Sequence, residues 1–291
     1  MALEYDKTPW RNDQWYTSFW NFDERSQNMW NFADQIKIHD VTLRDGEQQS
    51  RVAFTKDQKV AIAQKLDEVG MHRIEAGMPA VSRDDYEAIE EMLHCNLKTD
   101  IFCFARCMVS DAKLAADLGV KGVVMEIPAN ELLIKYGYRW ETEKAIASAV
   151  EATKYAHERG LYVVLFMIDF SRASFDYATN FVDAVNRDGH FDALTCVDTQ
   201  GALSPLGAYC MVRTVKERYP DKKIEFHGHA AVTCAQPQFT YRKFRAKGFQ
   251  HYFGKVNAVV LNIVNNITAN AKALAKSRLG KTALLADFLN A

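Results

Sequence analysis

The 291-residue sequence lacks any apolar run long enough to cross a bilayer, and it has no excess of charge of either sign. Its 36 lysines and arginines face 37 aspartates and glutamates, which gives a formal net charge of −1. Without a basic field a nucleic-acid partner is not expected, and without an apolar run neither is a membrane. The first residues also lack the apolar stretch of a secretory signal, so we expect a cytoplasmic protein with a small-molecule substrate.

Cysteine is sparse and scattered. The six residues show no pair at the spacing of a zinc ribbon or a thioredoxin motif, and no dense disulfide framework is expected. Buried reduced thiols are the simpler interpretation. Cys103 and Cys107 flank Arg106 near the end of a predicted strand, where a functional thiol is the alternative interpretation.

Tryptophan is concentrated in residues 1–34, a polar segment with little periodicity that holds Trp10, Trp15, Trp20 and Trp30. We interpret this segment as an arm that packs its aromatic side chains on a surface. That surface belongs either to the chain's own folded domain or to a second subunit. The sequence is 48% apolar, and residues 35–291 are enough to bury one large core, so we expect a single catalytic domain there.

From residue 35 onward, short β-like runs alternate with amphipathic helical stretches, which is typical of repeated βα units. Strands are predicted at residues 36–41, 73–76, 101–105, 122–127, 162–168, 193–197, 224–227 and 250–256. Helices are predicted at residues 56–69, 83–94, 111–118, 141–159, 175–187, 206–218, 236–247 and 266–276. Glycines just after helices, as at Gly70, and Ser204-Pro205 just before one support these boundaries. Eight units predict an α/β fold, a (β/α)8 TIM barrel with an N-terminal aromatic-rich arm.

Polar residues stand at each of the first seven predicted strand ends, where a TIM barrel builds its active site. They are Arg44 with Asp45, Glu75, Arg106, Glu126, Asp169 with Arg172, Asp198 with Thr199, and His227 with His229. One charge at a strand end is ordinarily a solvated loop residue. The recurrence at all seven ends favours a shared catalytic mouth.

His227 and His229 are two residues apart at the end of an apolar run. Side chains at positions i and i+2 of a strand share one face, so both imidazoles can reach one cation, and Asp45 from the first strand can complete the site. Mixed imidazole and carboxylate ligation suits zinc, manganese, cobalt or iron, and magnesium less well. Such an ion keeps positions open for the carboxylate and ketone of a 2-oxo acid and acts on them as a Lewis acid. Two ordinary packing or solvent-facing histidines are the alternative.

Arg44 adjoins the predicted ligand, and its guanidinium could grip a carboxylate or polarise the same carbonyl, or else form a salt bridge with Glu75 or Glu126. Thr199 could donate to a substrate carboxylate or cap the turn before the next helix. Gln48 could contact substrate or simply be exposed. The predicted catalytic residues are Arg44, Glu75 and Asp169. The predicted substrate-binding residues are Arg44, Gln48, Arg106 and Thr199.

The segment at residues 38–49, IHDVTLRDGEQQ, resembles the first-strand motif of the metal-dependent Claisen-type barrels. That family includes isopropylmalate, homocitrate and citramalate synthases and hydroxymethylglutaryl-CoA lyase. Further matches are IEAGMPA at residues 74–80, DTQGALSP at 198–205 and FHGH at 226–229. The resemblance covers residues 36–229 and is closest to the 2-oxo-acid acyltransferases.

The resemblance implies that Asp45, His227 and His229 bind a divalent ion of manganese, zinc, cobalt or magnesium, and that Arg44 and Thr199 contact the 2-oxo acid. It implies acetyl-CoA as co-substrate. The methyl carbon of acetyl-CoA would lose a proton and attack the ketone, and hydrolysis of the thioester would then drive formation of a 2-hydroxy diacid. We expect a homodimer that serves amino-acid biosynthesis.

The sequence also departs from the family pattern. After His229, the run AAVT at residues 230–233 replaces an Asn or Asp pair and a glycine, and Asn265 is only a candidate fourth ligand. A histidine is absent near Leu132, and Ile168 stands where a glutamate is common. Beyond Glu225, nine lysines and arginines face a single acid. This basic tail could bind the phosphates of coenzyme A, form a solvated helix face, or reflect a disturbed reading frame.

Three hypotheses follow from the sequence. The first is an acyltransferase that condenses acetyl-CoA with a 2-oxo acid and converts the acyl group into an alkyl group on transfer. The second is a carbon–carbon lyase or aldolase of the same fold. The third is a catalytically impaired barrel that binds a metabolite or pairs with an active partner subunit, which the departures from the motif favour.

Overall fold

The structure is a computed structural model that describes residues 17–28 and 36–229. Of these, residues 38–229 belong to one compact unit, and residues 17–28 with 36–37 belong to a second. Within the second unit, the described residues form two short helices, η1 (Phe19–Asn21) and α1 (Glu24–Gln27). Trp20 is half exposed, and the other three tryptophans of the predicted arm lie outside the described residues. The division of the chain at residue 34 therefore stays a prediction.

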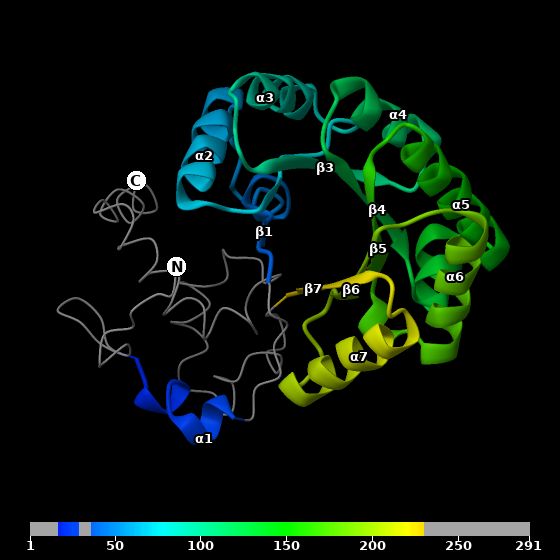
Figure 1. The fold of residues 1–291 in the computed structure, drawn as a ribbon. Helices are drawn as coiled ribbons and strands as arrows, with labels where there is room; N and C mark the ends of the chain where they lie inside the picture. Colours follow the sequence, from blue (N-terminus) through cyan, green and yellow to red (C-terminus); the bar gives the residue numbers. More distant parts are fainter. Residues whose placement is uncertain (1–16, 29–35, 230–291) are drawn as a thin grey trace. The chain divides into compact units, whose positions relative to one another are not determined.

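Seven strands form one sheet in which every neighbouring pair is parallel and the strands follow one another in chain order (Figure 1). They are β1 (His39–Asp40), β2 (Arg73–Glu75), β3 (Asp100–Arg106), β4 (Gly122–Pro128), β5 (Tyr162–Ile168), β6 (Ala193–Asp198) and β7 (Lys223–Gly228). The sheet curls, as the predicted α/β TIM barrel requires. The predicted eighth strand, at residues 250–256, lies outside the described residues.

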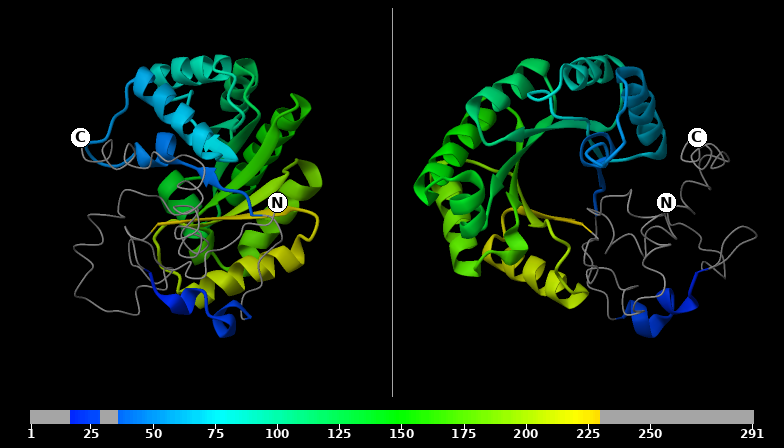
Figure 2. Two further views of the ribbon diagram at one scale, coloured as in Figure 1. Left: turned by 60° about the vertical axis from the view of Figure 1, so that its left-hand side comes forward. Right: turned by 180° about the vertical axis from the view of Figure 1, so that it is seen from behind.

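The connecting helices cover the outer face of the curled sheet (Figure 2). They are α2 (Lys56–Val69), α3 (Arg83–His94), α4 (Val109–Leu118), α5 (Thr142–Glu158), α6 (Phe175–Asp188) and α7 (Pro205–Arg218). Local chemistry sets their ends. Thr55 and Gln58 form a capping box at the start of α2, and Gly70 ends it with a φ of 84°. Ser204 caps α7, which begins at Pro205, one residue before the predicted start, so Ser204-Pro205 is confirmed as the start signal of this helix.

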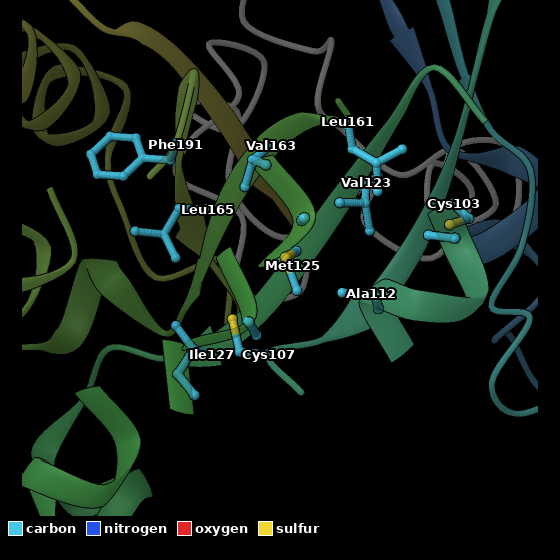
Figure 3. Packing of buried hydrophobic residues seen from close by; sticks show 14 of the residues in the cluster. Cys103, Cys107, Ala112, Val123, Met125, Ile127, Leu161, Val163, Leu165 and Phe191 are labelled. Atoms are coloured by element: carbon cyan, nitrogen blue, oxygen red, sulfur yellow. The ribbon is translucent and has the colours of Figure 1, made fainter. Parts of the chain in front are cut away.

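The core has two layers because the strands are buried on both faces. Between sheet and helices, side chains of β4 and β5 such as Val123, Met125 and Leu165 pack near Ala112 of α4 (Figure 3). Inside the curl, Phe104 of β3 packs edge-on against Phe166 of β5 at 5.3 Å between ring centroids, within a separate apolar cluster. This inner cluster forms the floor beneath the strand ends.

Two predicted elements differ from the structure by more than one residue at a boundary. The first strand was expected at residues 36–41, yet only His39 and Asp40 pair with β2, because the chain turns immediately afterwards. Helix α4 begins at Val109 and not at the predicted Asp111, since Met108 already occupies its N-cap position. Among the described helices, none combines the length and apolar character needed to cross a membrane.

Candidate active site

Arg44 and Asp45 lie in a π-helical turn, η2 (Thr42–Gly46), directly after β1. The turn begins there because the Asp40 carboxylate accepts both the backbone N–H of Thr42, at 2.9 Å, and its hydroxyl, at 3.2 Å. Arg44 and Asp45 are each only 6% exposed. The turn therefore buries two charged side chains at the mouth of the curled sheet.

Asp45 meets His227 of β7 and His229, which follows β7. One ligand atom from each residue lies within 4.8 Å of the others. His227 Nε2 is 3.2 Å from His229 Nε2 and 3.8 Å from Asp45 Oδ2. Two ligand atoms that each lie about 2.1 Å from one ion are about 3.0–3.4 Å apart at octahedral or tetrahedral angles. The two imidazoles thus have the spacing of ligands to one metal.

The protonation states also suit a metal. Burial lowers the pKa of His227 well below its usual value, and the Arg44 charge adds to the effect, so the imidazole is neutral and keeps a lone pair for an ion. The buried atoms Asp45 Oδ2 and His227 Nδ1 have no hydrogen-bond partner among the described residues. A divalent ion would give Asp45 Oδ2 a partner and would bind the Nε2 atoms of His227 and His229, which face each other. The residues therefore fit a divalent ion.

Arg44 occupies the centre of the site. Its Nε donates to Glu75 Oε1, its Nη1 donates to Asp45 Oδ1 at 2.9 Å, and its guanidinium carbon lies 4.0 Å from the centroid of the Phe104 ring. The remaining nitrogen, Nη2, is buried and has no partner within the described part of the chain. The salt bridge with Glu75 is thus present, and one guanidinium nitrogen of the arginine that binds Asp45 is still available for a ligand.

Glu75 is the carboxylate that anchors Arg44 and is 1% exposed. Burial raises the pKa of Glu75, while the Arg44 charge and hydrogen bond oppose that rise. His39 Nε2 lies 3.4 Å from Glu75 Oε2, and burial lowers the pKa of His39 well below its usual value, so this imidazole is neutral. Sequence reasoning selected Glu75 and missed His39, although His39 stands inside the first-strand motif.

Glu126 was expected from the sequence only as a strand-end acid and as an alternative salt-bridge partner of Arg44, which pairs with Glu75 instead. On neighbouring strands it is level with Arg106 of β3 and Phe166 of β5. Its carboxylate forms no hydrogen bond or ion pair with any described residue. Burial raises the pKa of Glu126, and the charges of Arg44 and Arg106 oppose the rise. The mouth therefore holds an unpaired carboxyl whose proton is bound more tightly than usual.

Two predicted site residues lie outside the Arg44 cluster in ion pairs of their own. Arg106 is half exposed and donates to both carboxylate oxygens of Asp111, at 2.8 and 3.0 Å. Asp169 is buried and accepts both hydrogen bonds of the Arg172 guanidinium, at 2.7 and 2.8 Å. A substrate-binding role for Arg106 and a catalytic role for Asp169 stay predictions.

Thr199 links two strand ends, because its hydroxyl oxygen accepts the backbone N–H of Asp169 at 2.9 Å. The alternative that Thr199 caps the turn before α7 is wrong: Asp198 accepts the loop N–H groups of Ala202 and Leu203, and Ser204 caps the helix. Its hydroxyl hydrogen stays available to a substrate. Gln48 lies just beyond the turn Thr42–Gly46 with an exposed side chain, and its substrate contact stays a prediction.

The thiols near the mouth are inert. Cys103 and Cys107 are buried, and burial raises the pKa of both, so neither forms a thiolate readily. This favours the interpretation of both as buried reduced thiols.

Two positions that depart from the family pattern lie within the described residues: Leu132 is 62% exposed, and Ile168 packs against the inner cluster. The run at residues 230–233, Asn265 and the basic tail lie outside the described residues.

Comparisons with known proteins show which family the chain resembles. A homocitrate synthase, AksA, from Methanopyrus kandleri is 34% identical over 196 residues, which cover 67% of this chain and 49% of that protein. 2-Isopropylmalate synthase 2 from Caldanaerobacter subterraneus is 32% identical over 194 residues, which cover 67% of this chain and 50% of that protein. The chain thus spans about half the length of the curated relatives it matches.

Among solved structures, the hydroxymethylglutaryl-CoA lyase from Pseudomonas aeruginosa has the same fold. It superimposes with a TM-score of 0.62 at 16% identity, over 87% of this chain and 98% of the lyase. The model of the HMGL-like family matches residues 35–238. With the first-strand motif, the parallel curled sheet and the match over most of its length in agreement, the chain belongs to the HMGL-like family.

Proposed function

We propose that this chain is an acyltransferase that condenses acetyl-CoA with a 2-oxo acid on a divalent metal ion held by Asp45, His227 and His229. The observation that carries the proposal is the convergence of these three ligand atoms within 4.8 Å, beside an arginine that has an unpartnered buried donor. The relatives named homocitrate synthase and 2-isopropylmalate synthase support this reaction class.

The bound ion would supply Lewis acidity toward the ketone and carboxylate oxygens of the 2-oxo acid. Arg44 Nη2, the free donor of a charged group, suits the ketone oxygen, on which negative charge develops. Thr199 keeps its hydroxyl hydrogen for the substrate carboxylate, since the oxygen of that hydroxyl already accepts from Asp169. These two donors would orient the acid relative to the ligands.

The condensation needs a group that accepts a proton from the methyl carbon of acetyl-CoA. Glu126 is suited because it is unpaired and its pKa is raised by burial, which makes its carboxylate a stronger base than usual. The methyl carbon then forms a bond to the ketone carbon as the π bond of the ketone breaks, and the resulting alkoxide oxygen takes up a proton from water, to which Glu126 releases the proton that it accepted. Water cleaves the thioester in the last step and releases free coenzyme A.

A thiol-release assay on the full chain tests the proposal. With Mn²⁺, acetyl-CoA and a panel of 2-oxo acids that carry methyl, branched-alkyl or carboxyalkyl side chains, we expect free thiol only when acid and metal are both present. Asp45→Asn should abolish the activity. The matched control, Asp67→Asn, changes a partly buried carboxylate of α2 that accepts the backbone N–H of Thr99 just before β3, and it should retain the activity.

The same experiment separates the other hypotheses. Silence with every 2-oxo acid, together with cleavage of 3-hydroxyacyl thioesters or 4-hydroxy-2-oxo acids, would replace the synthase by a lyase or aldolase. Silence in both assays with Mn²⁺ bound would leave a barrel that binds a metabolite without turning it over.

A further inference from the structure

Lys59 of α2 is a lysine buried where its helix packs on the sheet, and its side chain is 1% exposed. Its ammonium donates to the Leu43 carbonyl at 3.1 Å, lies 2.5 Å from Glu47 Oε2, and donates to Asp85 Oδ1 at a shorter distance. Three acceptors match the three N–H bonds of an ammonium group. Lys59 is therefore fully satisfied inside the protein, and no water is needed to solvate it.

Two of these contacts bracket the residues of the proposed metal centre. Leu43 immediately precedes Arg44, and Glu47 is the first residue after the π-helical turn. One ammonium group thus holds both ends of the segment that carries Arg44 and Asp45. The other oxygen of Glu47 accepts the backbone N–H of Phe54 at 2.8 Å, which fixes the far end of the same loop.

The third contact reaches the loop after β2. Asp85 accepts the backbone N–H of Met78 at 2.6 Å, three residues beyond Glu75. The Asp85 carboxylate lies so close to the backbone of Gly77 that a Cβ on this residue would be only 2.7 Å from it. Gly77 also has a φ of 152°, which favours glycine. Glu75 in turn binds Arg44. Lys59 therefore joins, at one atom, the loop of the metal ligand and the loop that follows the anchor of Arg44.

We infer that Lys59 is a positioning residue for the metal centre, whose ammonium group holds Asp45 and Arg44 in place relative to His227. The inference rests on the proposed function for its metal. A buried ionic cluster is weak evidence for stability, since apolar replacements of similar volume are often no less stable. Its consequence here is geometric, because both loops converge on one charged atom that a methionine side chain cannot replace.

Two measurements on the full chain test the inference. Lys59→Met keeps the length of the side chain and removes the ammonium group. Hydrogen exchange of the metal-free protein should rise in peptides covering residues 43–48 and 76–79, where the amides of Arg44, Gly46 and Met78 are hydrogen-bonded. Calorimetric titration with Mn²⁺ should show at least a tenfold loss of affinity.

A structural control distinguishes positioning from general weakening. Val185→Ala creates a cavity in α6, where Val185 is fully buried in the helix layer, and should lower the unfolding midpoint without changing Mn²⁺ affinity. Adding Glu47→Gln and Asp85→Asn to Lys59→Met removes the two unpaired carboxylates. Stability should then recover while Mn²⁺ affinity stays low, because the contacts to both loops are still missing.

The outcomes are separable. If affinity recovers together with stability, or if Lys59→Met changes neither loop exchange nor affinity, Lys59 is a structural residue and the inference is overturned. If the wild type binds no Mn²⁺, the proposed function fails, and the exchange data still decide whether Lys59 holds the two loops. If Lys59→Met does not fold, Glu47→Gln alone should raise exchange at residues 43–48 and lower affinity severalfold, and unchanged values would again overturn the inference.

Discussion

Replacing Arg44 by methionine should destabilise the protein in a pH-dependent way. The change removes the hydrogen bonds to Glu75 and Asp45 and leaves Glu75, which is 1% exposed, without its counter-charge. Breaking a buried ion pair from one side costs about 3–5 kcal/mol when the remaining group stays charged. We expect that loss at pH 8 in metal-free buffer.

The cost should shrink at low pH because Glu75 can take up a proton. Burial raises the pKa of Glu75, so between about pH 4.3, the usual value for an unfolded glutamate, and its raised value the folded protein binds more protons than the unfolded one. Stability therefore falls as pH rises through that window. Arg44 lowers the pKa of Glu75, so Arg44→Met moves the upper end of the window to higher pH. The destabilisation at pH 5 should be smaller than at pH 8.

Urea unfolding of the wild type, Arg44→Met, Glu75→Gln and the double variant at both pH values measures the effect. Adding Glu75→Gln to Arg44→Met should recover most of the stability lost at pH 8, since the glutamine amide carries no charge to leave unpaired. Arg213→Met is the matched control, because Arg213 and its partner Glu217 are both exposed, so neither is left as a buried unpaired charge and the loss should be far smaller at both pH values. An equal loss at both pH values, or no recovery in the double variant, would refute the role of the buried pair.

Three further results are expected. Glu126→Gln should remove one ionisation from the pH dependence of kcat/KM for thiol release and leave Mn²⁺ affinity within a factor of about two, and an unchanged profile would exclude Glu126 from proton transfer. Ser204→Ala should cost about 1 kcal/mol in urea unfolding through loss of the α7 cap, whereas no loss would show that the cap is dispensable. Alkylation with iodoacetamide at pH 8, mapped by mass spectrometry, should modify exposed Cys210 far faster than the buried thiols, and comparable rates would contradict their burial. Those thiols are Cys103, Cys107 and Cys196.

The sequence predicted the elements well where local chemistry decides their ends. The bounds of α2 and α3 agree with the predicted ranges, because Thr55 and Ser82 accept N–H groups at their starts and Gly70 adopts the left-handed conformation after α2. Parallel strands buried on both faces are short apolar runs, so the positions of the first seven predicted strands and their order along the sheet are confirmed, whereas the eighth stays a prediction. The turn at Thr42–Gly46 was not readable, since its π-helical form depends on the side chain of Asp40 and on burial by later elements.

The candidate site could be predicted in part, because residues at strand ends converge once a barrel is assumed. That assumption placed Asp45 with His227 and His229, and the structure has them together. Pairings between loops could not be predicted, since they depend on where each side chain points after the sheet curls. Arg106 with Asp111 is such a pairing. Lys59 did leave a signal, as a charged residue on the buried face of α2 beside Val60 and Ala63, but its partners come from two other segments, the turn after β1 and the start of α3.

The most direct test of the account is a crystal of the full chain soaked in Mn²⁺ and measured at a wavelength that reveals the ion by anomalous scattering. The account predicts one strong peak about 2.0–2.3 Å from Asp45 Oδ2 and from one ring nitrogen each of His227 and His229. A map with no peak between these three side chains, at a Mn²⁺ concentration that fills other sites, would contradict it.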